Sequence, residues 1–275
     1  MRVRVEHPRR LLLLVGAALL VAVAGSVAVW VAAAADGGKV EDRLPNLTQA
    51  TPDNLSGRTG GTIATPRFFL GFESAAANLG EGPLIVLGHR TAGEPRMTLQ
   101  QRILLSDGSS RTLPLRSTMR YVRSADHAHW HVDRFMRYEL RSADGNRVVR
   151  DRKTGFCLGD RYRASQTLPG RPSRPLYRNR CGRGAPDMRS VNEGISIGWG
   201  DNYEAHLEGQ ELELTSLPAG RYVLVHRVNV SRDLTESDYS DNQASMAIDL
   251  SWPRGPAFAP SIDVVARCPA TDICP

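Results

Sequence analysis

The sequence has 275 residues, which is enough for one large domain or two ordinary ones. An apolar fraction of 41% and a charged fraction of 23% are typical of a globular protein with a sizeable core, and argue against a disordered chain. The net charge of +6 comes almost wholly from arginine, because the chain has only two lysines, Lys39 and Lys153. Since no motif of a nucleic-acid-binding protein accompanies this charge, we expect no nucleic-acid partner.

The first 36 residues predict export from the cytoplasm. Four arginines precede an apolar run over residues 11–35, and basic residues stay on the cytoplasmic side of a membrane. The run is long enough to span a bilayer as a hydrophobic helix, yet it ends in the small residues that a signal peptidase accepts, VAAAADGG. Residues 1–36 are therefore either a signal peptide or a signal anchor, and the remaining chain is extracytoplasmic, secreted or anchored to the membrane.

The rest of the chain predicts an all-β fold. Residues 37–60 are polar and rich in Gly and Pro, and indicate a linker. Turn residues then separate segments in which apolar and polar side chains alternate, as they do in strands. The clearest of these segments are 67–90, 97–115, 134–151, 210–230 and 242–252. Since no long helical pattern occurs beyond the leader, we expect a β-sandwich-like domain over residues 61–255.

Two further segments complete this organisation. Residues 159–198 are rich in Arg, Gly and Pro and have little periodicity, so they predict a long irregular loop that is either solvated or the rim of a substrate site. Residues 256–275 form a tail with a Cys pair. The four cysteines, Cys157, Cys181, Cys268 and Cys274, allow three disulfide pairings, of which pairing between sequence neighbours is the simplest.

Three of the seven histidines, His127, His129 and His131, stand at alternate positions in DHAHWHVDRF. On a strand all three point to one face, with neighbours about 7 Å apart and the outer pair about 13 Å apart. They are either a half-buried polar stripe or a metal site for copper, zinc, iron or nickel. If all three bind one ion, the strand has to bend, bulge or end here. Asp133 has the same parity and is a candidate fourth ligand or supporting group, whereas the isolated histidines His89, His206 and His226 are expected to be structural.

With these histidines, the chain resembles the lysyl oxidases, and in particular their shorter bacterial homologues. The resemblance covers roughly residues 45–250. It rests on four segments that occur in the family's order: HAHWHVDRFMRYEL, RKTGFCLGDRY, GISIGWGDNYEAHLEGQELELTSLPAGRYVLVHRVN and LTESDYSDNQ. The chain departs from the animal enzymes before the histidines, where it has YVRSAD in place of a segment with tryptophan and cysteine. That departure puts an elastin or collagen substrate in doubt.

The resemblance implies oxidative deamination of primary amines, including peptidyl lysine, to aldehyde, ammonia and hydrogen peroxide with molecular oxygen. It implies copper held by His127, His129 and His131. It also implies a lysyl tyrosylquinone made from Lys153 and Tyr203 of the chain itself. Cys157 and Cys181 resemble a family disulfide beside the lysine segment.

The residues fit that chemistry. A carbonyl electrophile is needed to capture an amine, and no ordinary side chain supplies one. Lys153 is the only lysine after the predicted linker in a chain that uses arginine nearly everywhere else, and arginine could not supply the amine for a cross-link. Asp201 is a candidate for the base that deprotonates the substrate.

Two other classes of protein explain part of the pattern. A zinc hydrolase uses three histidines and a metal-bound water, but it gives Lys153 and Tyr203 no role. A non-catalytic exported β-sandwich binding module is consistent with the alternating strands of residues 210–250. Copper with a hydrazine adduct identifies the oxidase, zinc without an adduct the hydrolase, and neither metal nor adduct the module.

Overall fold

All regular structure in the described residues, 39–124, 128–178 and 180–275 of a computed structural model, is β-strand. Within these ranges no helix is long and apolar enough to cross a bilayer. The hydrophobic helix expected within residues 1–36 lies outside the described residues. Residues from Val40 to Pro275 form one compact unit.

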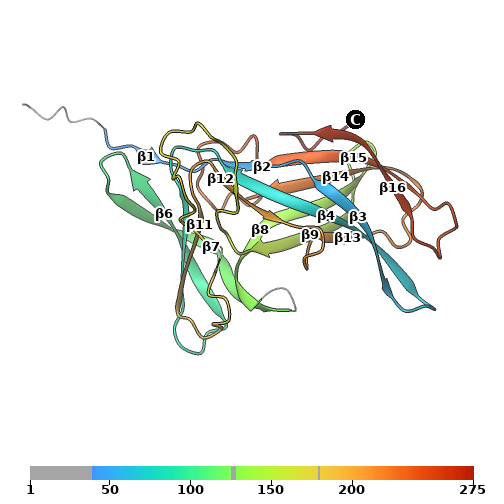
Figure 1. Cartoon of the computed structure of the whole chain (residues 1–275), viewed down its shortest axis with the longest axis horizontal. Helices are drawn as coiled ribbons and strands as arrows, with labels where there is room; N and C mark the ends of the chain where they lie inside the picture. The colour runs from blue at the N-terminus through green and yellow to red at the C-terminus, as the bar shows by residue number, and fades with distance from the viewer. Residues whose placement is uncertain (1–38, 125–127, 179) are drawn as a thin grey trace, which may run out of the picture. The chain divides into compact units, whose positions relative to one another are not determined.

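Ten strands form the larger of two antiparallel sheets (Figure 1). Eight of them follow one another in the spatial order β11 (Ser190–Ile195), β5 (Leu84–His89), β6 (Arg96–Leu105), β7 (Ser110–Arg123), β8 (Ala128–Ser142), β14 (Gly220–Val228), β15 (Gln243–Ser251) and β16 (Ser261–Cys268). The other two are β1 (Asp42–Arg43), which pairs with β6, and β9 (Val148–Phe156), which pairs with β8. The long strand β8 is therefore central, because it contacts β7, β9 and β14 along its length.

Six strands form the second sheet around the long strand β4 (Pro66–Asn78). Its partners are β2 (Leu47–Gln49), β3 (Asp53–Gly61), β12 (Trp199–Tyr203) and β13 (Glu211–Glu213), and β10 (Tyr162–Arg163) adds to β12. The short strand β12 carries Tyr203 at its end.

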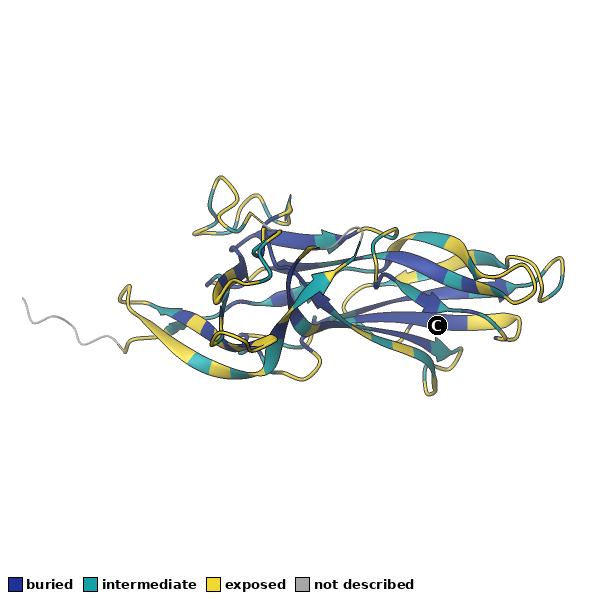
Figure 2. Ribbon diagram, turned by 90° about the horizontal axis from the view of Figure 1, so that it is seen from below, coloured by how far each residue is buried: buried dark blue, intermediate teal, exposed yellow. Residues whose placement is uncertain are grey.

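The hydrophobic core lies between the two sheets. Buried side chains concentrate on the middle of the long strands, whereas the hairpin tips are exposed (Figure 2). The ring of Phe72 on β4 is 4.8 Å from that of Tyr138 on β8 and 4.6 Å from that of His226 on β14, measured between centroids. Aromatic contacts across the layers bury large areas, so they hold the sheets face to face. The predicted sandwich-like, all-β architecture is confirmed.

A hairpin with Asp144, Gly145 and Asn146 at its tip joins β8 to β9. Asn146 N–H donates to the carboxylate of Asp144, and Gly145 has a φ of 73°, which favours glycine. The segment 37–60 differs from the expected linker, since it contains β1, β2 and β3. Leu47 in β2 is fully buried, and its N–H donates to Glu236 over 2.6 Å. The backbone of this polar segment is hydrogen-bonded to β6 through β1 and to β4 through β2 and β3.

The tail and the long loop also contain strands. The tail 256–275 includes β16, which pairs with β15, and the segment 159–198 includes β10 and β11. The two disulfides join sequence neighbours, Cys157 with Cys181 and Cys268 with Cys274, so the simplest pairing is confirmed.

Candidate active site

His129 and His131 lie on β8, as the alternation of the histidine run predicts. The rings of His129 and His131 are 4.8 Å apart between centroids, with an angle of 36° between their planes. Only 4% of His129 and 5% of His131 is exposed, so the two imidazoles are held next to each other in the protein interior. His127 lies outside the described residues. Among the residues that are described, no three His, Cys, Asp or Glu side chains form a group that could hold a metal ion.

Tyr203 reaches this histidine pair from the second sheet. Its hydroxyl oxygen is 3.4 Å from Nε2 of His131, and it accepts a hydrogen bond of 2.9 Å from the N–H of Cys157. The ring packs on Phe156 with centroids 3.9 Å apart, and only 3% of the residue is exposed. Burial raises the pKa of Tyr203 well above its ordinary value, and the nearby carboxylate of Asp201 adds to that rise. The phenol is therefore neutral, buried and fixed in position.

The disulfide between Cys157 and Cys181 ties together two backbone contacts of this site. Cys157 supplies the N–H that binds Tyr203, and the carbonyl of Cys181 accepts a hydrogen bond of 2.8 Å from the N–H of Trp130. In the sequence, Trp130 lies between the two buried histidines, His129 and His131. β9 pairs with β8 as far as Phe156. Beyond that point, the segment with Cys181 takes the place of β9 beside β8.

Buried carboxylates hold the chain that follows Cys157. The N–H of Leu158 donates to Glu193 over 2.9 Å, and the N–H of Gly159 donates to Asp201 over 3.0 Å. Both carboxyl groups are almost fully buried, and burial raises the pKa of each well above its ordinary value. Sequence reasoning singled out Asp201 as a candidate base and did not consider Glu193. In the structure both groups position the backbone beside Tyr203.

Lys153 lies on β9, three residues before this strand ends at Phe156, and it is exposed. It lines a cavity of about 580 Å³ together with Gly155, two residues further along the strand. Gly155 packs closely against β8: a Cβ atom at this position would come within 2.9 Å of the Val132 carbonyl oxygen and 3.1 Å of the His131 Cβ. A side chain here would push the strands apart, so a glycine is required between the lysine and the histidine strand.

A bulge in β8 shapes this cavity. The register between β8 and β9 shifts between Val132 and Met136, so that three residues of β8 face only Gly155. Arg134, in the middle of the bulge, has a φ of 58°. Asp133 is turned toward arginines: it binds Arg96 and lies 2.9 Å from Nε of Arg120. Its carboxylate thus serves these arginines rather than acting as a fourth ligand beside the imidazoles.

The remaining described histidines have structural surroundings. His226 is fully buried between Phe72 and Tyr138, and burial lowers its pKa to about 3. His89 Nδ1 contacts the hydroxyl of Ser190, and His206 lies on the surface beside Glu204.

The described structure thus defines an all-β protein in which paired imidazoles of one sheet meet a buried tyrosine of the other beside a disulfide. The sequence model of one family, lysyl oxidase, matches residues 90–252, which is more than half of the chain. The chain belongs to the lysyl oxidase family.

Several curated proteins of this family are similar to the chain. Protein-lysine 6-oxidase of Gallus gallus is 31% identical over 139 residues, which are 50% of this chain and 30% of that protein. Lysyl oxidase homolog 3B of Danio rerio is 28% identical over 127 residues, or 44% of this chain and 14% of that protein. Lysyl oxidase homolog 2 of Gallus gallus is 25% identical over 153 residues, or 55% of this chain and 18% of that protein. The chain therefore spans less than a third of the length of these three relatives.

Proposed function

We propose that this protein is a copper-dependent amine oxidase that acts outside the cytoplasm. It converts a primary amine, with one oxygen molecule and one water, to an aldehyde, ammonia and hydrogen peroxide. The observation that carries the proposal is the 3.4 Å approach of the Tyr203 hydroxyl to Nε2 of His131. A side chain able to bind copper is thus adjacent to the tyrosine that corresponds to the oxidised tyrosine of the family.

In this proposal His127, His129 and His131 bind the copper. Imidazole is a ligand that copper accepts, and the two described rings are buried and adjacent, so the donor set fits the metal. Tyr203 and Lys153 are the precursors of the lysyl tyrosylquinone, which supplies the carbonyl electrophile for amine oxidation. The N–H of Cys157 holds the Tyr203 oxygen in place until maturation.

The burial of Tyr203 and the exposure of Lys153 also support distinct roles. A buried phenol beside Phe156 is protected from water, whereas an exposed amine on β9 can move. Substrate enters through the cavity that Lys153 lines. The two disulfides fit an oxidising, extracytoplasmic location. Peptidyl lysine is the natural class to test first, because relatives of this chain are named protein-lysine 6-oxidase.

The proposal is tested on purified protein matured with copper in air. We expect about one copper per chain, a coloured adduct with phenylhydrazine, and hydrogen peroxide release with primary amines. Zinc without an adduct, together with hydrolytic activity, would identify a hydrolase instead. A protein that binds neither metal nor hydrazine would be a binding module.

A further inference from the structure

The cavity at the β8 bulge is strongly cationic. Five of its lining side chains are positively charged at neutral pH: Arg96, Arg116, Arg120, Arg134 and Lys153. Its lining contains two carboxylates, Asp133 and Asp233. Positive groups therefore outnumber negative ones by three in a space of about 580 Å³, a size suited to a small molecule.

The two carboxylates are mostly buried, and both already have hydrogen-bond partners within the protein. The side chain of Asp133 is 14% exposed; it binds Arg96 and accepts a hydrogen bond of 2.9 Å from the Thr118 hydroxyl. The side chain of Asp233 is 8% exposed and accepts the backbone N–H groups of Arg116 and Ser117. With their oxygens engaged in this way, neither carboxylate is well placed to attract a cationic substrate.

The arginines that pair with these carboxylates, Arg96 and Arg120 with Asp133 and Arg116 with Asp233, are nonetheless largely exposed to solvent. The exposed fraction of the side chain is 53% for Arg96, 76% for Arg116 and 51% for Arg120. Within the described residues no carboxylate pairs with Arg134, which the bulge holds at the cavity. Guanidinium groups bind carboxylates in a bidentate manner, so this rim is built to receive an anion.

We propose that the cavity selects primary amines that carry a carboxylate at the far end of the molecule. This inference rests on the proposed function, because Lys153 is what connects the cavity to the reacting centre. The arginine rim binds the carboxylate while the amine end points toward Lys153 and the Gly155 wall that covers His131.

The excess positive charge of the cavity also acts on the amine end of the substrate. Surrounding positive charge disfavours an ammonium ion and favours the neutral amine, which is the form that can attack a carbonyl. A substrate with a second positive charge is repelled, and one with a carboxylate is attracted. The cavity thus favours a zwitterionic substrate over a dicationic one of the same length.

The test compares three amines that differ only at the far end: 6-aminohexanoate, pentylamine and 1,5-diaminopentane. For the copper-matured full chain we expect kcat/KM to be highest for 6-aminohexanoate and at least about tenfold lower for 1,5-diaminopentane.

Arg116→Gln and Arg134→Gln should each reduce the ratio of kcat/KM for 6-aminohexanoate to that for 1,5-diaminopentane by about two- to fivefold. Arg221→Gln is the matched control, because Arg221, at the exposed start of β14, pairs with Asp249 of β15 and does not line the cavity.

A second measurement does not depend on catalysis. Glutarate, which has no amine, should bind copper-free protein in a calorimetric titration, about fivefold more weakly after Arg116→Gln or at about 0.3 M salt. If no amine is oxidised but glutarate binds as expected, the proposed function fails and the anion site stands. A preference for 1,5-diaminopentane, or a ratio unchanged in both arginine variants, overturns the inference. A peptide with lysine between acidic residues, oxidised faster than 6-aminohexanoate, would identify a polypeptide as the source of the carboxylate.

Discussion

The two halves of β8, on either side of its bulge, differ in how they use polar side chains. Before the bulge, His129 and His131 are buried side by side, close to the Tyr203 hydroxyl. After the bulge, the polar side chains Arg137, Glu139 and Arg141 belong to a network of ion pairs. One strand thus carries both a candidate reaction centre and a network of ion pairs that stabilises the fold.

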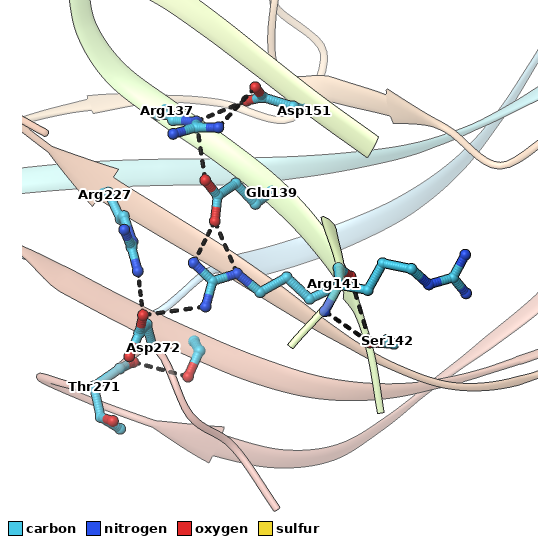
Figure 3. Close-up of polar contacts among 10 residues, drawn as sticks. Arg137, Glu139, Arg141, Ser142, Asp151, Arg227, Thr271 and Asp272 are labelled. Carbon is cyan, nitrogen blue, oxygen red and sulfur yellow. Dashed lines mark hydrogen bonds and ion pairs between the residues drawn. The ribbon is translucent and has the colours of Figure 1, made fainter. Parts of the chain in front are cut away.

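The network after the bulge is closed and neutral (Figure 3). Glu139, which is 2% exposed, lies between Arg137 and Arg141, with contacts of 2.9 Å and 2.8 Å. Arg137 also binds Asp151 on β9, and Arg141 also binds Asp272 in the C-terminal tail. With Arg227, which contacts Asp272, three arginines balance three carboxylates.

The difference between the two halves of β8 indicates which polar groups are candidates for a functional role. Charges that neutralise one another within the protein stabilise a fold or a register, and they leave nothing for a ligand. By contrast, the histidine half gathers groups of one kind, imidazoles, next to a phenol, and the adjoining cavity has excess positive charge. Groups of this second kind indicate a partner from outside the chain. The following changes test this contrast, beginning with the largest expected effect.

Lys153→Arg and Tyr203→Phe should each reduce amine oxidation to the background. Arginine keeps the charge without the amine, and phenylalanine lacks the phenolic oxygen that becomes a quinone carbonyl. Both variants should fold and bind copper, which metal analysis and circular dichroism will show. Mass spectrometry should find the two peptides covalently joined in the matured parent protein only. Tyr222→Phe, which removes a hydroxyl bound to Pro218, is the control and should stay active. Separate peptides in an active enzyme would refute the assignment.

His129→Ala should weaken copper binding by about a hundredfold or more, since it removes one of the proposed ligands. Quinone absorbance and peroxide release should be lost with it. His206→Ala changes a histidine whose side chain is 68% exposed, and it should keep the copper content of the parent. Full copper content and full activity in His129→Ala would contradict the metal site.

Glu139→Ala, in the other half of the same strand, should act on stability alone. It leaves Arg137 and Arg141 without their shared buried carboxylate, so we expect the free energy of unfolding to fall by about 3 kcal/mol or more. Asp249→Ala, at an exposed pair with Arg221, should change it little. Denaturant unfolding measures both, and copper content per folded molecule should stay the same. Loss of copper from folded Glu139→Ala would mean that the two halves are coupled.

The disulfides should contribute unequally to stability. Their cysteines are 24 residues apart for Cys157–Cys181 and 6 apart for Cys268–Cys274. In the chain-entropy view the longer loop is worth about 3.5 kcal/mol and the shorter about 2.2 kcal/mol. Replacing each pair with serines tests the order by thermal unfolding. Only loss of Cys157–Cys181 should also slow quinone formation, because this disulfide alone contacts the Tyr203 site. Equal maturation in the two variants would argue against that role.

The smallest effect concerns pH. Neither ring nitrogen of His226 has a hydrogen-bond partner among the described residues, and burial lowers its pKa from 6.5 to about 3. The unfolded chain therefore binds a proton that the folded chain refuses, and stability is lost as pH falls from about 6.5 toward 3. Between pH 7 and about pH 5.5, His226→Leu should lose about 1 kcal/mol less stability than the parent. An identical pH dependence would show that folding does not lower the pKa of His226.

Several features of the fold could be predicted from the sequence because local spacing decides them. Alternation of His129 and His131 places both side chains on one face of a strand, and the structure has their rings adjacent. Turn residues at Asp144 and Gly145 fix a hairpin tip through their own backbone preferences. The pairing of Cys157 with Cys181 followed from their order along the chain and from the family resemblance.

Other features depend on contacts between distant residues and could not be predicted in this way. The strands within residues 37–60 form because β4 and β6 offer free edges, which the polar sequence of that segment does not reveal. The approach of Tyr203 to His131 depends on two sheets packing face to face.

What the sequence by itself determined is therefore the set of reactive residue types and the strands that carry them. Only the tertiary structure decided which of them meet. The bulge at Asp133, Arg134 and Phe135 arises from the register between β8 and β9, and this register turns Asp133 toward Arg96 and Arg120. A single residue of register shift moves a side chain to the other face of a sheet, and pairing with a distant strand sets that register. The cationic cavity beside Lys153 exists for the same reason.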